Sequence, residues 1–296
     1  MIDFTTLPKC NKAYSGGTGE KISILYQNEP YMLKFPSQVN KEGKVSYNNT
    51  CITEYIGSNI FSMLGLDAQE TILGTFEENG QKIAVIACKD FTSTNNVLLD
   101  FASLKNRVLP SPDNGHSMQL QDILRAIETQ GYISKDILRE HFWDMFIVDA
   151  FIGNFDRHNG NWGFLYNKHT DEMTIAPIYD CAKCLNPNAD EARMKSIMER
   201  EAGFAARGYI FPTSAIECDG EKVNYFDFIS SLENPDCNKA LEKIAKRIDM
   251  SEIEKMIEKI PCISIIQKQF YINMLRWRKA CIIDYSYNLL RNKILR

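Results

Sequence analysis

The sequence predicts an α+β protein with two lobes, a β-rich lobe at about residues 1–92 and a mainly α-helical lobe over 93–296. Three observations support this prediction. Short apolar runs separated by turn residues fill the first part of the chain. Apolar residues at three- and four-residue steps, the period of an amphipathic helix, dominate the segment from Cys237 onward. Between these parts, an apolar helix and a β-hairpin flank a loop rich in Asn, Asp and Gly.

The composition is that of an ordinary globular protein and argues against some functions. The 296 residues are 44% hydrophobic and 24% charged, and the net charge is −4 without a basic block, so we expect no nucleic-acid partner. No apolar stretch reaches the length of a membrane span, and the N-terminus has no signal-peptide pattern. We therefore expect a cytoplasmic protein, although export without a cleaved signal also fits.

The cysteines give a second indication of compartment. Nine of them, an odd number scattered from Cys10 to Cys281, favour a reducing environment over a disulfide framework. Cys181 and Cys184 form a Cys-x-x-Cys pair, the spacing found in zinc and redox sites. No second pair with ligand spacing accompanies it, so we interpret both residues as ordinary cysteines.

In the first lobe, a glycine-rich segment from Tyr14 to Lys21 precedes the expected sheet. The expected elements are a strand over 22–26, a strand over 31–36, a helix over 50–64 and a hairpin over 70–76 and 82–88. Pro36 ends the second strand, because proline cannot continue a ladder, and Gly65 stops the helix. Asn79-Gly80 is a strong hairpin-turn signal. The chain leaves this sheet through Cys88 to Phe91.

The second lobe is predicted from helical periodicity around one hairpin. Its elements are an exposed loop over 109–115, a helix over 120–127, a helix over 138–150, a hairpin over 162–167 and 173–178, and helices after 237. Ser134 is the expected N-cap of the second helix. Residues 186–208 carry many charges and few β-branched residues, which leaves open either a helix or a mobile substrate-binding segment.

The loop between the 138–150 helix and the hairpin carries polar groups in an informative order. Asn161 follows Asp156 by five positions, and Asp180 lies where the hairpin ends. Protein kinases use this order: an Asp that orients the substrate hydroxyl, an Asn five positions later that holds Mg²⁺, and a second Asp for the metal. Oxygen ligands suit a hard cation, and a carboxylate can accept the hydroxyl proton. A solvated turn favours the same residue types.

The first lobe contains other parts that a kinase needs. The glycine-rich segment is no Walker A loop, because no Gly-Lys-Ser/Thr follows and the next element is a strand. It fits a loop that covers nucleotide phosphates, or a plain hairpin turn. Lys34 follows at the distance of the lysine that pairs with ATP phosphates, although strand alternation also allows a solvent-facing lysine. Glu54 is either a surface acid or the partner of Lys34.

The pattern Asn154-x-Asp156-x-His158-x-x-Asn161, followed by Ala176 to Asp180, resembles that of the HipA-like serine/threonine kinases, and within them the short bacterial CtkA-type kinases. The resemblance covers nearly the whole chain. It implies a two-lobed protein-kinase-like fold of the HipA and phosphoinositide 3-kinase type. It also implies ATP- and Mg²⁺-dependent phosphate transfer to a Ser or Thr hydroxyl, and an ion pair between Lys34 and Glu54, which we expect to be exposed.

The resemblance implies a role for each candidate residue. Asp156 is expected to orient and deprotonate the acceptor hydroxyl. His158 lies two residues after it, whereas the protein-kinase histidine lies two before, and is expected to fix the loop by a hydrogen bond or to contact phosphate. Asn161 and Asp180 are the expected Mg²⁺ ligands. The expected ATP-binding residues are Ser15, Gly16, Gly17, Thr18, Gly19, Lys21, Lys34 and Glu54, with Tyr179 and the backbone from Lys89 to Phe91 around the adenine.

The chain departs from full-length HipA at its beginning. Its glycine-rich segment starts near residue 14, which leaves almost no room for the additional N-terminal subdomain of HipA, so an antitoxin-like partner is not indicated. Tyr14 stands where the HipA pattern has its autophosphorylated serine, and Ser15 and Thr18 are the nearby alternatives. We expect a protein substrate. A lipid or small-molecule kinase and a non-catalytic nucleotide-binding pseudokinase are the alternative classes.

Overall fold

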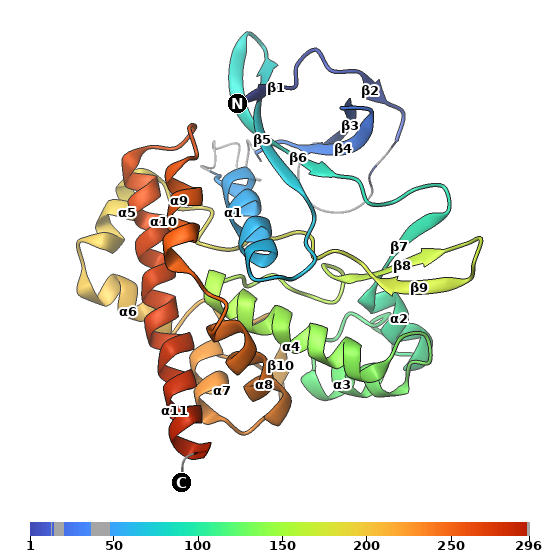
Figure 1. The fold of residues 1–296 in the computed structure, drawn as a ribbon, viewed down its shortest axis with the longest axis vertical. Coiled ribbons are helices and arrows are strands. Elements are labelled where there is room, and N and C mark those ends of the chain that lie inside the picture. The colour runs from blue at the N-terminus through green and yellow to red at the C-terminus, as the bar shows by residue number, and fades with distance from the viewer. Residues whose placement is uncertain (13, 15–20, 37–47, 295–296) are drawn as a thin grey trace.

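The computed structural model describes residues 1–12, 14, 21–36 and 48–294. A six-stranded sheet with one helix, α1, forms the upper part in Figure 1, and helices form most of the remainder. A three-stranded sheet projects at one side of the helical part. The predicted β-rich and α-rich parts are therefore confirmed, whereas their boundary at residue 92 stays a prediction. No helix in the described part of the chain is long and apolar enough to cross a membrane.

The six-stranded sheet has the order β1-β5-β6-β4-β3-β2. Its neighbouring strands are antiparallel except for β1 and β5. Asn79 and Gly80 connect β5 to β6 with φ angles of 51° and 76°, the conformation for which Asn-Gly turns are favoured. The strands are β1 (Ile2–Asp3), β2 (Lys9–Cys10), β3 (Lys21–Tyr26), β4 (Glu29–Lys34), β5 (Thr71–Glu78) and β6 (Gln81–Lys89).

The two faces of this sheet belong to different hydrophobic cores, because successive side chains of a strand point to opposite faces. On β6, Val85 and Ala87 join a small cluster within the sheet lobe. Ile86 and Cys88 join the large core that extends into the helical part. Lys34 on β4 pairs in register with Ile86 and therefore points to the face that α1 covers.

Helix α1 (Thr50–Met63) lies between the sheet and the helical part (Figure 1). Its residues Ile52, Ile56 and Ile60 are buried in the large core. Gly65 follows the helix with φ of 75°, a left-handed conformation that glycine adopts without a steric penalty. The helix predicted over 50–64 is confirmed to within one residue.

Hydrogen bonds fix both ends of α1 to the helical part. At the N-terminal end, the main-chain N–H of Asn49 donates to the carbonyl of Pro187 at 2.8 Å, and Gln267 Nε2 donates to Asn49 Oδ1 at 3.1 Å. At the C-terminal end, Arg247 Nη1 donates to the carbonyl of Leu64 at 2.9 Å. The helix is therefore attached to the helical part as well as to the sheet.

The helical part is built around α4 (Lys135–Ile152), which crosses the lower part of the molecule in Figure 1. Every residue from Phe142 to Ile152 is buried, as expected for a core helix. Ser134 occupies the predicted N-cap position but its side chain makes no capping hydrogen bond. The other helices are α2 (Phe101–Val108), α3 (Leu120–Thr129), α5 (Glu191–Met198), α6 (Glu201–Tyr209), α7 (Tyr225–Ser231), α8 (Pro235–Ala245), α9 (Met250–Glu258), α10 (Ile265–Arg278), the π-helical turn η1 (Lys279–Asp284) and α11 (Tyr285–Ile294).

The predicted hairpin after the polar loop is present as β8 (Gly163–Asn167) and β9 (Glu172–Ile175). A third strand, β7 (Asn96–Asp100), pairs with β8 and was missed, because it is short and its partner lies more than sixty residues away. The undecided region 186–208 contains α5 and most of α6. A short strand pair, β10 (Glu217–Cys218) and β11 (Glu221–Lys222), was also missed.

Candidate active site

The loop between α4 and β8 is held by a buried ion pair that the sequence analysis missed. The side chains of Arg157 and Asp149 are 5% and 1% exposed, and Arg157 Nε lies 3.0 Å from Asp149 Oδ2. Arg157 also donates to the carbonyl of Asn161 at 2.7 Å and to the carbonyl of Tyr179. One guanidinium therefore connects α4, the loop and the residue before Asp180. Burial opposes its charge, but Asp149 raises the pKa of Arg157 above the usual value, so the cation persists.

A sequence signal for this pair exists. Asp149 falls on the apolar face of the predicted helix, and a buried carboxylate needs a cation or several hydrogen-bond donors. Asn154 supplies a second donor, with its Nδ2 2.8 Å from Asp149 Oδ1. Asn154 Oδ1 in turn accepts from the main-chain N–H of Asp156 at 3.2 Å, and the hydroxyl of Tyr225 donates to the Asn154 carbonyl at 2.6 Å. The backbone of Asp156 is thus fixed by buried polar groups.

Asn161 and Asp156 are joined by a hydrogen bond. Asn161 Nδ2 donates to the carbonyl of Asp156 at 2.8 Å, and the main-chain N–H of Asn161 donates to the carbonyl of His158 at 2.8 Å. Because its amide nitrogen is engaged, the side-chain oxygen of Asn161 is the group left for a cation. His158 Nδ1 accepts from the main-chain N–H of Gly160 at 3.1 Å. That bond lies within the loop, as expected for a residue that fixes it, and the catalytic role of His158 stays a prediction.

Lys34 lies between two carboxylates from different parts of the chain. Its Nζ is 3.3 Å from Glu54 Oε1 on α1 and 3.6 Å from Asp180 Oδ1 after β9. The predicted contact between Lys34 and Glu54 is therefore present. The expectation of an exposed pair is wrong, because the side chain of Glu54 is fully buried and that of Lys34 is 16% exposed. Because side chains alternate along β4, Lys34 points toward α1. Glu54 lies on α1 among residues of the large core.

Lys34 and the carboxylates on either side of it stabilise one another's charges. Burial opposes the charge on Lys34, but Glu54 beside it raises the pKa of the ammonium well above its ordinary value. Partial burial opposes the charge on Asp180, while Lys34 and Arg157 lower the pKa of that carboxyl. Asp180 also has φ of 57°, which is uncommon outside glycine and is found disproportionately at functional sites.

Lys21 brings a second cation to the same place. It is the first residue of β3 and pairs in register with Lys34, so both side chains lie on one face of the sheet. Burial and the neighbouring charge of Lys34 lower the pKa of Lys21. Two lysines directly opposite each other repel, and this arrangement favours a site for an anion.

The predicted adenine-binding residues are only partly brought together. The rings of Phe91 and Tyr179 have centroids 6.0 Å apart, and the Tyr179 hydroxyl donates to the carbonyl of Gly160 at 3.2 Å. Lys89 faces elsewhere, since its ammonium pairs with Glu29, at the opposite end of β4 from Lys34.

The main-chain groups of Lys89 are also engaged within the protein. Its N–H donates to the carbonyl of Glu70 at 2.8 Å, and its carbonyl accepts from Gln69 Nε2 at 2.9 Å. Phe91 and Tyr179 are therefore the better placed of the three predicted residues. The remaining ATP-binding candidates, Ser15, Gly16, Gly17, Thr18 and Gly19, lie outside the described residues.

Cys181 and Cys184 are buried and support α1. Cys184 Sγ donates to the carbonyl of Thr53 at 3.3 Å, and Cys181 Sγ accepts from Arg157 at 3.4 Å. Burial raises the pKa of the Cys181 thiol to about 12, which favours the neutral form. Within the described ranges, no group of three or more His, Cys, Asp or Glu side chains is placed to hold a metal ion. The interpretation as ordinary cysteines stays a prediction.

The residues that would hold Mg²⁺ nevertheless suit it. Mg²⁺ is usually bound by one or two carboxylates together with substrate phosphates, and it retains several waters. Asp180 offers a carboxylate whose side chain is 38% exposed, and Asn161 offers its amide oxygen. Both are hard oxygen donors, and Asp180 lies 3.6 Å from Lys34, a cation that favours phosphate. The site therefore fits a metal that arrives with a nucleotide better than one bound by the protein alone.

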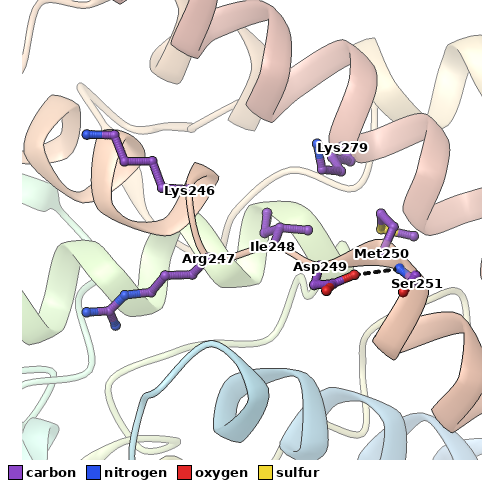
Figure 2. Close-up of a pocket in the computed structure, with 7 residues that line it drawn as sticks. All are labelled: Lys246, Arg247, Ile248, Asp249, Met250, Ser251 and Lys279. Carbon is purple, nitrogen blue, oxygen red and sulfur yellow. Dashed lines mark hydrogen bonds between the residues drawn. The ribbon is translucent and has the colours of Figure 1, made fainter.

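A hollow elsewhere in the helical part shares no residue with this site. It lies between α8, α9 and η1 and has a volume of about 570 Å³. Figure 2 shows Lys246 and Arg247 extending away from Asp249 and Lys279, so the cations do not converge. Lys246 pairs with Glu242 and Lys279 with Asp284. We therefore assign the candidate active site to the cluster around Lys34.

The fold and this cluster together define a two-lobed, kinase-like protein, with its polar groups contributed by both lobes. A family model described as the HipA-like C-terminal domain matches residues 13–259. The chain is 43% identical to the serine/threonine-protein kinase CtkA of Helicobacter pylori over 290 residues. This match spans 97% of this chain and 87% of that protein. The chain therefore belongs to the HipA-like kinase family.

Solved structures agree with this membership. The crystal structure of the Helicobacter pylori proinflammatory kinase CtkA matches with a TM-score of 0.94 and 42% identity, over 100% of this chain and 99% of that one. HipA of Shewanella oneidensis, in its complex with HipB and operator DNA, matches with a TM-score of 0.61 and 14% identity. That match covers 96% of this chain and 68% of HipA, and it shows a shared fold.

Proposed function

We propose that the protein is an ATP- and Mg²⁺-dependent serine/threonine protein kinase that transfers the γ-phosphate of ATP to a Ser or Thr hydroxyl. The observation that carries this proposal is the position of Lys34 between Glu54 and Asp180, at 3.3 and 3.6 Å. A lysine held by a buried acid and beside a metal-capable acid is the arrangement that protein kinases use for phosphoryl transfer. The 43% identity to a serine/threonine-protein kinase supports the choice of acceptor.

In this mechanism the chain acts by positioning and by neutralising charge, since phosphoryl transfer requires little covalent chemistry from the protein. Lys34 and Lys21 neutralise phosphate oxygens, and Phe91 and Tyr179 flank the adenine. Asp156 orients the acceptor hydroxyl and accepts its proton as the oxygen attacks the γ-phosphorus. The bond from that phosphorus to the β–γ bridging oxygen breaks, and ADP leaves with the electron pair.

Asp180 and the side-chain oxygen of Asn161 are the residues that would hold Mg²⁺. The metal supplies further charge neutralisation on the phosphates when it is bound. Arg157 holds these two residues in place relative to each other. It donates hydrogen bonds to the main-chain carbonyl of Asn161 and to that of Tyr179, the residue before Asp180.

We also propose that the kinase phosphorylates its own glycine-rich segment, at Ser15 or Thr18. A hydroxyl beside the γ-phosphate is a convenient acceptor, and a phosphate there would add roughly −1.5 to −2 charge near Lys21 and compete with ATP. Mass spectrometry after incubation with ATP should find a phosphate between Tyr14 and Ser23. Autophosphorylation confined to other regions of an active enzyme would refute this assignment.

The experiment that tests the proposed function is incubation with γ-labelled ATP, Mg²⁺ and a mixture of proteins and lipids. We expect label on Ser or Thr of proteins and none on lipid, and no transfer by Asp156→Ala. Label on phosphoinositides would establish a lipid kinase instead. Nucleotide-dependent thermal stabilisation without any transfer would establish a non-catalytic nucleotide-binding protein.

A further inference from the structure

Three consecutive apolar residues at the end of α6 are exposed to solvent: Tyr209, Ile210 and Phe211, here called the 209–211 run. Ile210 has the most exposed side chain of the three, at 62%. Single exposed apolar side chains are common on protein surfaces, but a run of three is unfavourable unless it has a function. The mechanism above gives these residues no role.

The main chain of the 209–211 run is fixed by hydrogen bonds. The N–H groups of Ile210 and Phe211 both donate to the carbonyl of Ala206, each at 2.9 Å. Asn224 Nδ2 donates to the carbonyl of Tyr209 at 2.8 Å and to that of Ile210 at 3.3 Å. The three apolar side chains are therefore held at the surface by a bonded backbone and are not a frayed helix end.

The buried side chain of Arg278 connects this end of α6 to α4. Its Nε donates to the carbonyl of Ala150 at 2.8 Å, and its Nη1 donates to the carbonyl of Arg207. Ala150 lies in the last turn of α4, and Arg207 lies in the last turn of α6. Two helix ends are therefore held together, one leading into the loop that carries Asp156 and the other into the 209–211 run.

A second connection comes from the start of α7. The hydroxyl of Tyr225 donates to the carbonyl of Asn154 at 2.6 Å, and the residue before it, Asn224, bonds the 209–211 run. Asn154 is followed by Phe155, whose side chain is exposed, and then by Asp156. Phe155 therefore adds an apolar side chain next to the residue proposed to orient the acceptor hydroxyl.

The exposed apolar side chains also continue onto α7 and α11. The ring centres of Tyr209 and Phe226 are 4.8 Å apart, and those of Phe226 and Tyr285 are 5.6 Å apart. Tyr285 is itself exposed. The helices α6, α7 and α11 are neighbours at the lower left of Figure 1. Contiguous exposed apolar side chains mark an interaction site more often than scattered ones do.

We propose that Phe155 and the 209–211 run bind apolar side chains of the acceptor protein, close in its sequence to the Ser or Thr that is phosphorylated. This inference rests on the proposed kinase function and names the class of its substrate. The acceptor protein is the partner that fits this surface, because its hydroxyl has to reach Asp156. Burial of apolar side chains stabilises such a complex, and a backbone already fixed lowers the entropy cost of binding.

The test is phosphorylation of a peptide library by the full chain with labelled ATP and Mg²⁺. Each peptide has one central serine, and one flanking position at a time is fixed as Leu, Phe, Gly, Asp or Lys. We expect the wild type to prefer Leu or Phe over Gly in at least one position. For that position, Ile210→Ser should lower kcat/KM for the apolar peptide roughly tenfold, mainly through KM, and change kcat/KM for the Gly peptide far less. Ile210→Leu should retain the preference.

Ile137→Ser is the matched control. Ile137 is 58% exposed and lies in the first turn of α4, at the opposite end of that helix from the catalytic loop. This variant should keep the wild-type preference, as a substitution of exposed isoleucine away from the proposed surface.

Three results would overturn the inference and leave the proposed function standing. The first is a wild type that phosphorylates proteins or peptides without any apolar preference. The second is an equal loss of activity toward the apolar and the Gly peptide in Ile210→Ser. The third is a dimer of this chain that Ile210→Ser dissociates while the peptide preference stays. Transfer to lipids alone, or no transfer by the wild type, would overturn the proposed function as well.

Discussion

At the residue scale, Glu54 is the residue whose environment differs most from the expectation, because the sequence analysis expected an exposed ion pair with Lys34. An exposed ion pair contributes only about 0.2–1 kcal/mol to stability. Glu54 is fully buried, and removing one partner of a buried pair costs about 3–5 kcal/mol. Asp180, 3.6 Å from Lys34, remains as a partially compensating partner. The pair should therefore matter for folding as well as for the orientation of Lys34.

Glu54→Gln should lower both stability and turnover. We expect a fall of several degrees in the melting temperature of the nucleotide-free protein, at roughly 2–4 °C for each kcal/mol lost. Turnover should fall on the order of tenfold or more, because Lys34 loses the group that orients it. Lys82→Met is the control, since Lys82 pairs with Asp3 at 2.8 Å on the surface of the same sheet and both side chains are largely exposed. Wild-type turnover in Glu54→Gln would remove the pair from the mechanism.

His141, on α4 beside Trp162, gives a pH-dependent prediction. Burial lowers its pKa from 6.5 to about 4 in the folded protein. Between these two values the unfolded chain binds a proton that the folded chain does not, so this histidine decreases stability as the pH falls through that range.

His141→Asn should therefore reduce the difference in melting temperature between pH 7 and pH 5. The control is His169→Asn in the exposed turn between β8 and β9, which should keep the difference found in the wild type. An unchanged difference in His141→Asn would show that its folded-state pKa is ordinary.

At the element scale, α1 is the part whose position decides the geometry around Lys34. Gly57 of α1 packs on the segment after Asp180: a methyl group there would lie 2.7 Å from Cys181 Cβ and 3.2 Å from Cys184 Sγ. Thr53 Oγ1 donates to the carbonyl of Ala182 at 2.6 Å. The helix that carries Glu54 thus rests directly on the segment that follows Asp180.

Gly57→Ala should lower both stability and turnover. At a solvent-exposed position of a helix, the same change would stabilise the folded protein by roughly 0.5–1 kcal/mol, because glycine is a poor helix residue. Overpacking of a closed contact costs about 1–3 kcal/mol, so the clash outweighs that gain. Gly131→Ala is the control, since a methyl group at Gly131 meets nothing within 4 Å. A Gly57→Ala variant that is more stable and fully active would show that α1 can move without loss of stability or turnover.

The elements that the sequence predicts well are those with a local signal. Asn79-Gly80 predicts its hairpin, and the apolar spacing in 50–64 predicts α1, because each pattern lies within a few residues. The strand β7 and the burial of Glu54 depend on contacts with distant segments, which no local pattern records. Arg157 falls between these cases, since its partner Asp149 is visible on the apolar face of a predicted helix.

At the scale of the whole molecule, the site is assembled by contacts between the two parts. The main-chain N–H of Ile178 donates to the carbonyl of Asp67 at 2.8 Å, and that of Gln69 donates to the carbonyl of Ile178 at 2.9 Å. These bonds join the segment between α1 and β5 to the residues just before Asp180. Asp180 and Lys34 are therefore held in contact by the backbone of both parts.

The division of roles between Asp156 and Asp180 follows from this assembly. Asp180 contacts Lys34, whereas Asp156 lies on the loop that Arg157 and Asn154 fix to α4. We assign the metal to Asp180 and the acceptor hydroxyl to Asp156. The two carboxylates should therefore affect different steps.

Calorimetric titration of Mg²⁺-ATP into the wild type, Asp156→Ala and Asp180→Ala tests this division most directly. We predict that Asp180→Ala abolishes Mg²⁺-dependent ATP binding, and that Asp156→Ala binds ATP nearly as the wild type does while transferring no phosphate. Equal loss of ATP affinity in the two variants, or full affinity in Asp180→Ala, would contradict the assignment of metal and base in this site.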